Sequence, residues 1–465
     1  MVFSSLLFLF LYLPVVLAVY YLFPAKWRNF WLFFVNLVFY GWGEPVYILL
    51  MLFSITLNYA AGLLVERYRD DRPRARRVLT ITIVVNLALL GFFKYYDLFA
   101  RTLSLLPGVS VPELGLTLPI GISFYTFQTM SYPIDLYRGD AEVQRNYVRF
   151  GTFVALFPQL IAGPIVRYKD VADQLGFRAG GIDQFSSGVR RFAVGVGKKV
   201  LLANNIGMLW DVYAGKSVAE LTVAGAWLGI VAFSMQIYFD FSGYSDMAIG
   251  LGRMLGFEFL ENFNYPYISR SVTEFWRRWH ISLGTWFRDY VYIPLGGNRR
   301  GLARQFFNIF IVWALTGFWH GANWNFLCWG IYYAIFLMLE KAFLLEKLKT
   351  LPAFIGHAYA VLVAVCGWVM FDLDSISHIG GYYKAMFGLA TGGMGNAGDL
   401  FYLRNYGFVL LTGALACTPL GKTLYARLPQ KAQDFAAPVL ILVVLVLSTA
   451  YLVDSTYNPF LYFRF

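Results

Sequence analysis

The segment TGFWHGANWN, Thr316–Asn325, places a histidine inside an apolar tract. This tract runs from Gln305 to Leu339 without an Asp, Glu, Lys or Arg, and His320 lies near its middle. A neutral imidazole is the usual general base near pH 7, because its pKa lies in the physiological range. His320 is therefore a candidate catalytic residue, and a hydrogen-bonded core histidine is the structural alternative.

The length of this tract predicts a break beside His320. As one helix, its 35 residues would be about 50 Å long, which exceeds a single membrane span. Gly317 and Gly321 offer a place for the break. Irregular backbone at membrane depth is tolerated only where it is buried in protein or lines a cavity. We therefore expect His320 to face protein or water rather than lipid.

A second polar segment, residues 271–301, interleaves three tryptophans with arginines and carries His280. Its end, PLGGNRRG, predicts a glycine-rich turn in which backbone N–H groups, Arg299 and Arg300 suit a phosphate. The alternative is an amphipathic helix whose tryptophans and arginines form an anchoring belt at the membrane–water interface. His280 has no role in such a belt.

A third segment, YFDFSGYSDMAIGLGRMLGF, carries two carboxylates, Asp240 and Asp246, in an apolar run. A charge at the bilayer centre costs about 2.5–3.5 kcal/mol on insertion scales, so such residues are functional candidates. The alternative is a structural ion pair, for example Asp246 with Arg253, or a cluster of serine–aspartate hydrogen bonds.

Composition defines the elements that must position these groups. The 465 residues are 58% hydrophobic and only 14% charged, whereas soluble domains carry about 25% charged residues. Apolar runs recur along the whole chain, which predicts one all-α polytopic membrane domain over residues 1–465 with some short or broken helices. The three cysteines have no metal-like spacing, and we expect no metal site.

Charge predicts the orientation of the chain. A net charge of +11 suggests nucleic acid in a soluble protein, but here it is expected in cytoplasmic loops, with membrane lipid rather than nucleic acid as the contact. The arginine-rich segment 66–77 should then lie inside, and three spans before it place the N-terminus outside. The apolar first segment is interpreted as a retained transmembrane helix.

Together, YFDFSGYSDMAIGLG, ENFNYPYISRSVTEFWRRWHISLGTWFRDYVYIPLGGNR and GFWHGANWNFLCWG resemble the membrane-bound O-acyltransferase family, in its bacterial alginate O-acetyltransferase-like branch. The resemblance implies a helical disc with funnels from both faces and re-entrant or broken helices. It implies transfer of acetyl from cytosolic acetyl-CoA across the bacterial inner membrane to an extracytoplasmic polysaccharide, with an alginate-type polymer favoured. His320 matches the catalytic histidine of the family, and His280 matches the second histidine of this branch.

The same chemistry suggests roles for other residues. A tetrahedral oxyanion needs hydrogen-bond donors, which Asn323, Trp319 or His280 could supply. Basic side chains could bind the phosphates of CoA or, alternatively, lipid headgroups. Asp240 is a further candidate for substrate binding. The four candidate phosphate ligands are Arg277, Arg278, Arg299 and Arg300.

The chain ends in an aromatic tail, residues 454–465, whose FLYFRF sequence should dock rather than lie in water. This F-x-Y-F-x-F pattern resembles a tail motif of the family, and the resemblance implies that Tyr462 carries the acyl group in transit. A periplasmic partner of the serine-hydrolase type would then receive the acetyl group and act on the polysaccharide. An aromatic anchor at the membrane interface is the structural alternative for this tail.

Three other functions stay open at this point. The first two keep the reaction class and change the acceptor or cargo: O-acetylation of peptidoglycan, and D-alanyl transfer toward teichoic acid. The fused tail favours acetyl over D-alanyl transfer. A transporter is the remote third possibility, and the absence of an internal repeat in the sequence argues weakly against it.

Overall fold

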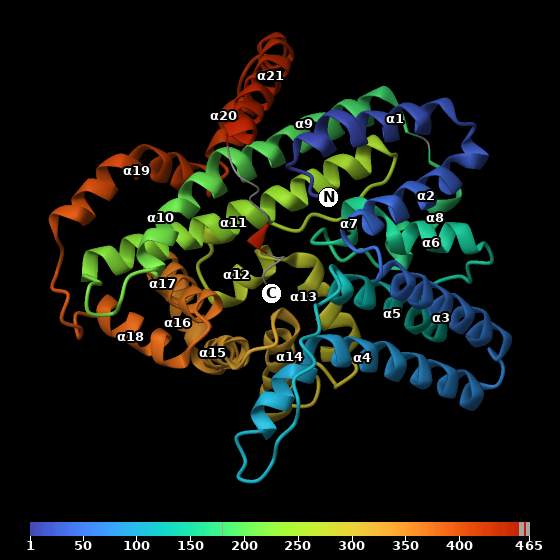
Figure 1. Cartoon of the computed structure of the whole chain (residues 1–465), viewed down its shortest axis with the longest axis horizontal. Helices are drawn as coiled ribbons and strands as arrows, with labels where there is room; N and C mark the ends of the chain where they lie inside the picture. The colour runs from blue at the N-terminus through green and yellow to red at the C-terminus, as the bar shows by residue number, and fades with distance from the viewer. Residues whose placement is uncertain (179, 455–459, 462–465) are drawn as a thin grey trace. The chain divides into compact units, whose positions relative to one another are not determined.

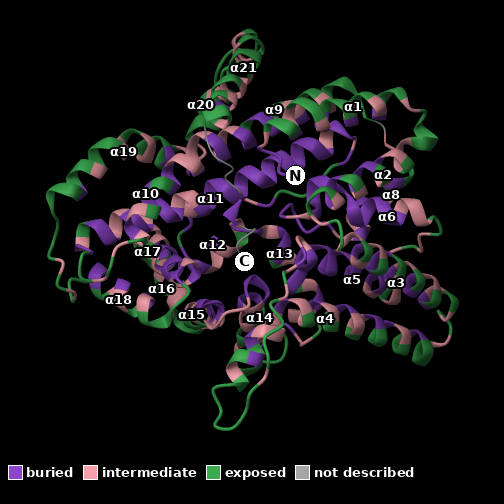
Figure 2. Cartoon of the chain, viewed as in Figure 1, coloured by how far each residue is buried: buried purple, intermediate pink, exposed green. Residues whose placement is uncertain are grey.

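Helices form every regular element in the computed structural model, which describes residues 1–178, 180–454 and 460–461 (Figure 1). This confirms the all-α prediction. Long apolar runs favour helices here because a membrane offers no water to satisfy an open backbone. Many of the helices expose apolar side chains on one side while burying the other, as the mixed colours of Figure 2 show.

The chain divides into two compact units. Unit 1 comprises Met1–Phe192 and Tyr244–Glu261. Its helices are η1 (Phe8–Tyr12), α1 (Leu13–Leu22), α2 (Ala25–Gly43), α3 (Ile48–Arg67), α4 (Arg72–Leu103), α5 (Ile122–Arg138), α6 (Tyr147–Ala155), α7 (Phe157–Leu160), α8 (Tyr168–Gly176) and most of α9 (Ile182–Gly197).

Unit 2 comprises Ala193–Gly243 and Asn262–Phe465, so α11 (Val223–Met254) contributes to both units. Its other helices are η2 (Lys198–Ala203), α10 (Asn204–Ala214), η3 (Pro266–Ile268), α12 (Val272–Arg278), α13 (Ile281–Phe287), η4 (Arg288–Tyr292), α14 (Leu302–His320), α15 (Trp324–Leu339), η5 (Glu340–Leu344), α16 (Leu345–Thr350), α17 (Ala353–Asp372), α18 (Ile376–Met386), α19 (Ala397–Ala416), α20 (Leu420–Ala426) and α21 (Gln430–Asp454).

Six helical stretches of the described chain are long and apolar enough to cross a membrane, and a seventh arises if the bent pair α19–α20 is one span. The protein is therefore a multi-pass membrane protein. Other apolar segments form helices too short for this, such as Phe8–Leu22. The predicted break beside His320 is confirmed, because α14 ends at this residue and α15 begins at Trp324.

The arginine-rich segment 66–77 joins two of these candidate spans. Helix α3 continues to Arg67 and α4 begins at Arg72, so the connection is a four-residue turn and most of the arginines lie on the first turns of α4. The carboxylate of Asp71 accepts a hydrogen bond from the backbone N–H of Arg74 and caps α4.

The predicted pairing of Asp246 with Arg253 is wrong. In unit 1, Asp246 pairs instead with Arg191, whose guanidinium lies 2.6 Å from the carboxylate and also contacts Glu261. Arg253 pairs with Glu258. The physical reason is spacing, since residues seven apart are two helical turns distant and only residues three or four apart contact one another on a helix.

Candidate active site

One large cavity of unit 2 brings the two predicted histidines together. It has a volume of about 1010 Å³ and is formed by residues of α12, α13, the glycine-rich turn 294–301 and α14. Both His280 and His320 line it, and both are buried. A cavity of this size lies at the upper end of those that hold cofactors and other small molecules.

His320 is the last residue of α14 and is held by packing. Its ring lies between those of Trp319, Trp329 and Phe371, with centroid distances of 5.1, 5.0 and 5.2 Å. Gly321 follows in an extended conformation and ends the helix. The side chain is only 5% exposed, so the imidazole faces protein and the cavity rather than lipid, as expected.

The glycines around His320 allow α14 and α15 to approach closely. A Cβ on Gly330 would lie 2.3 Å from the carbonyl oxygen of Trp313, and one on Gly317 would lie 2.3 Å from that of Phe326. At Gly321, a Cβ would overlap the ring of Phe326. These positions therefore require glycine because another backbone or ring occupies the space.

His280 is held by hydrogen bonds on a strained backbone. It lies between α12 and α13 in the left-handed region, with φ 44° and ψ 54°. Its Nδ1 lies 3.1 Å from Oδ1 of Asn262, which also accepts hydrogen bonds from the backbone N–H and the hydroxyl of Ser282. A left-handed conformation is uncommon for residues other than glycine and recurs at functional sites.

The Ser282 amide fixes the protonation of this imidazole. A backbone N–H is only a donor, so the atom of Asn262 that faces it is the carbonyl oxygen, and the 3.1 Å contact of this oxygen with Nδ1 favours a proton on Nδ1 over the longer 3.4 Å contact of Nδ1 with the Ser282 hydroxyl. Nε2 of the neutral ring is then an acceptor. In this tautomer, His280 cannot donate a hydrogen bond from Nε2 to an oxyanion. This argues against its predicted role as an oxyanion donor.

Burial keeps His280 neutral. This residue lies outside the candidate membrane spans, and desolvation lowers its pKa from 6.5 to about 3. Its ring also contacts that of Trp319 at 6.0 Å, so Trp319 packs against both histidines. We conclude that His280 presents a neutral, oriented acceptor at physiological pH.

The cavity wall is strongly basic. Arg277, Arg299, Arg300 and Lys341 line it, and none of the four has an ion-pair partner within the described part of the chain. No Asp or Glu belongs to its described lining. Unpaired cations around a cavity without acidic residues suit an anionic ligand such as a phosphate. The sequence did not single out Lys341, because a lysine that ends an apolar helix usually lies in solvent.

The glycine-rich turn that carries Arg299 and Arg300 is confirmed. Gly296, Gly297 and Gly301 all have positive φ values, and this conformation explains why glycine occupies them. The amide of Asn308 on α14 donates to the carbonyl oxygen of Gly297 at 2.8 Å. The turn is therefore fixed against the helix that ends in His320.

The remaining predicted residues lie elsewhere. Arg278 pairs with Glu274 at 2.9 Å, and Asn323 caps α15 while its Nδ2 donates to the carbonyl oxygen of Asp374. Asp240 pairs with Lys199. With Trp319, these three residues are absent from the described lining of the cavity. Tyr462 lies outside the described residues.

The interpretation of residues 271–301 as one belt helix is wrong. This segment breaks into α12, α13 and η4, and its tryptophans pack inward: Trp279 is 3% and Trp286 is 5% exposed. The ring of Trp276 contacts those of Trp313 and Trp329. The period of the sequence pattern did not reveal that Trp276 packs against α14 and α15.

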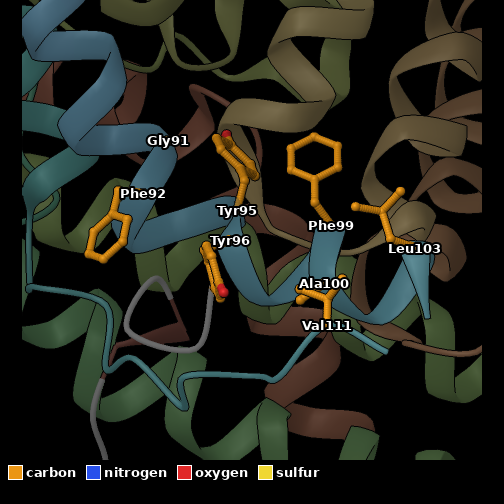
Figure 3. A pocket seen from close by; sticks show the side chains of 8 residues that line it. All are labelled: Gly91, Phe92, Tyr95, Tyr96, Phe99, Ala100, Leu103 and Val111. Atoms are coloured by element: carbon orange, nitrogen blue, oxygen red, sulfur yellow. The ribbon is translucent and has the colours of Figure 1, made fainter. Parts of the chain in front are cut away.

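A second cavity, in unit 1, lacks such chemistry. Figure 3 shows its lining, which comes mainly from α4 and includes Tyr95, Tyr96 and Phe99. Its volume is about 350 Å³, and no charged side chain belongs to its described lining. The unit 2 cavity is therefore the better candidate for an active site.

Comparison with known proteins decides the family. The chain matches the profile of the membrane-bound O-acyltransferase family over residues 141–354, which contain both histidines and the four unpaired cations. It is 44% identical over 391 residues to the probable alginate O-acetylase AlgI of Azotobacter vinelandii, covering 83% of this chain and 78% of that protein. The chain belongs to the membrane-bound O-acyltransferase family.

Two further relatives of this membrane-bound O-acyltransferase differ in the polymer that their names state. The probable alginate O-acetylase AlgI of Pseudomonas putida is 40% identical over 487 residues, covering 100% of both chains. The peptidoglycan O-acetyltransferase of Helicobacter pylori is 32% identical over 429 residues, covering 84% of this chain and 80% of that protein. The protein is thus an enzyme, an O-acyltransferase, and the resemblance seen in its motifs is confirmed.

Proposed function

We propose that this acyltransferase takes acetyl from cytosolic acetyl-CoA and passes it across the bacterial inner membrane for O-acetylation of an extracytoplasmic polysaccharide. The observation that carries the proposal is one cavity lined by two buried histidines and by four basic side chains without an ion-pair partner in the described chain. The basic side chains suit the phosphates of CoA. The names of the Azotobacter and Pseudomonas relatives favour an alginate-type polymer, and that of the Helicobacter relative makes peptidoglycan the alternative.

In the proposed reaction, His320 is the general base. Its imidazole removes the proton of an acceptor hydroxyl as that oxygen attacks the thioester carbonyl carbon. The C–S bond then breaks, and the imidazolium returns its proton to the departing CoA thiolate, so His320 ends neutral. His280 orients the acceptor or the donor through its Nε2 lone pair.

Tyr462 is the first acceptor in this proposal. A phenol with a pKa near 10 forms an activated ester, so it can pass acetyl on to a serine of a periplasmic partner of the serine-hydrolase type. The proposal includes a thin helical disc open to both faces, with the N-terminus outside. For this transfer, acetyl-CoA and the acceptor must reach one site from opposite sides of the membrane.

Labelled acetyl-CoA tests the reaction in lipid nanodiscs that contain the full chain. We expect acetyl to appear on Tyr462, detected by mass spectrometry of the C-terminal peptide, and the rate to fall at least about 100-fold in His320→Ala. His378→Ala is the matched control, since His378 lies on α18 and does not line the cavity. Unchanged labelling in His320→Ala would overturn the proposal. A transporter would move substrate without consuming acetyl-CoA.

The polymer is tested in cells. In a deletion strain, we expect the acetyl content of an alginate-type exopolysaccharide to fall and to return with the wild-type gene but not with Tyr462→Phe. Loss of acetyl from peptidoglycan alone would shift the assignment to the alternative acceptor. Full acetylation with Tyr462→Phe would remove the tyrosine relay.

A further inference from the structure

The described end of the chain is buried in unit 2. Phe460 is 1% and Leu461 is 5% exposed, and Leu461 belongs to the same hydrophobic core as Trp279 and Trp329. The backbone N–H of Leu461 donates to Oδ2 of Asp240 at 2.9 Å. This hydrogen bond joins residues 221 positions apart in the sequence, so it fixes the tail to α11.

Asp240 shares its carboxylate between two partners. Its Oδ1 lies 2.5 Å from Nζ of Lys199, while Oδ2 accepts from Leu461. Asp240 and Lys199 are 3% and 2% exposed, and the ammonium of Lys199 also lies 4.7 Å from the ring centroid of Phe460. Buried charges need paired charges and further hydrogen bonds to offset their desolvation, and the tail supplies one such hydrogen bond to Asp240 and an aromatic ring beside Lys199.

Glycines bring the elements of this site into close contact. A Cβ on Gly243 would lie 3.2 Å from the backbone nitrogen of Lys199, so α11 and the π-helix η2 approach closely there. At Gly197, a Cβ would lie 2.9 Å from the side chain of Val444 on α21, the helix that precedes the tail. Lys199 thus lies where α11, α21 and the tail meet.

The Asp240–Lys199 pair, which holds the tail, also lies close to the candidate active site through the next residue on α11. Phe241, the residue after Asp240, packs its ring on that of His280 with a centroid distance of 4.7 Å. Tyr462 follows Leu461 directly in the sequence and lies outside the described residues.

We propose that Asp240 and Lys199 are a positioning pair that holds the backbone of Leu461 so that the next residue, Tyr462, meets the acyl donor. This inference rests on the proposed role of Tyr462 as acyl carrier. It assigns Asp240 to the tail instead of to a substrate. The ion pair between Asp240 and Lys199 then contributes to acyl transfer as well as to stability.

Two double variants separate positioning from structure. Lys199→Met with Asp240→Ala removes both charges and the acceptor of the Leu461 N–H. Lys199→Met with Asp240→Asn also removes both charges but keeps an acceptor oxygen. We expect the first double variant to slow acetylation of Tyr462 about 10- to 100-fold, and the second to recover most of this loss. The affinity for acetyl-CoA should stay unchanged in both.

A second pair of variants leaves the ion pair intact. Leu461→Pro removes the donor N–H, whereas Leu461→Ala keeps it and only trims the side chain. We expect the acetylation of Tyr462 to be slower in Leu461→Pro than in Leu461→Ala. The comparison of the two Leu461 variants decides the proposal if the charge variants do not fold.

The outcomes separate the two proposals. If the wild-type chain forms no acetyl-Tyr462, the relay through the tail fails, whatever the pair does. If the wild type forms acetyl-Tyr462, the two double variants are compared with each other, and so are the two Leu461 variants. Equal rates within both pairs would mean that only the positioning role fails.

Discussion

Two helix junctions of unit 2 each present a buried histidine to the same cavity, and they do so by different means. At the α14–α15 junction, His320 is held by aromatic rings and by glycines that let the helices touch. At the α12–α13 junction, His280 is held by the Asn262 amide and a left-handed backbone. Trp319 contacts both rings.

The difference matters for chemistry. A general base must take and release a proton, and His320 lies at the break between α14 and α15 on the wall of the cavity. Hydrogen bonding to Asn262 fixes one tautomer of His280, and burial favours its neutral form. This contrast accompanies the two roles proposed above, proton transfer for His320 and orientation of a partner for His280.

Replacing each histidine tests this division most directly. We expect His320→Ala to lower the rate of acetyl transfer about 10²- to 10⁴-fold, the range of general-base catalysis. His280→Asn should lower it only about tenfold, because it removes one hydrogen-bond acceptor and asparagine tolerates the left-handed backbone. Rates are measured with saturating acetyl-CoA. Equal losses would show that the two residues do not differ in role.

Packing at the first junction is tested at Gly330. Gly330→Ala should lower stability by about 1–3 kcal/mol, since its Cβ would meet a backbone oxygen at 2.3 Å and the helices must separate. The thermal midpoint in detergent and the transfer rate should fall together. Gly407→Ala, on α19 with open space around it, is the control: it should leave the transfer rate unchanged and raise the midpoint slightly, because alanine favours a helix more than glycine does.

Hydrogen bonding at the second junction is tested at Asn262. Asn262→Ala leaves buried donors on His280 and Ser282 without this acceptor, which should cost about 1–3 kcal/mol of stability. Asn262→Asp keeps an acceptor oxygen and is the conservative comparison. If both variants have the wild-type thermal midpoint and rate, the amide does not hold His280.

The basic wall should affect donor binding more than chemistry. We expect Arg299→Gln with Arg300→Gln to raise KM for acetyl-CoA about tenfold with little change in kcat, and to weaken the salt dependence of binding. Arg278→Gln is the control, because Arg278 pairs with Glu274 and is not part of the described cavity wall. An unchanged KM in the double variant would point to lipid headgroups as the ligands.

The last prediction concerns pH. His280 has a folded-state pKa near 3 against 6.5 for the ordinary side chain, so below pH 6.5 the unfolded chain binds a proton that the folded chain does not. Stability should therefore fall as pH decreases from 6.5 toward 3, and His280→Asn should weaken this dependence. Thermal midpoints across that range provide the measurement, and an unaltered pH profile in the variant would contradict it.

Local patterns in the sequence predicted the helical class, the break beside His320 and the glycine-rich turn, because apolar runs and glycine positions report short-range structure. Partners distant in sequence were not predicted: Asn262 for His280, Arg191 for Asp246 and Lys199 for Asp240. No periodicity encodes such pairings, since they arise only when separate segments of the chain pack together. The roles of the site residues stay predictions until the variants are measured.

The left-handed backbone at His280 has a practical consequence for mutational scans of this enzyme. Glycine and asparagine fit that conformation most easily, whereas branched side chains strain it. In a saturation library at position 280, glycine and asparagine should thus accumulate best in the membrane, although neither has an imidazole. Abundance and activity would then rank the library differently, and only both readings together reveal what histidine contributes.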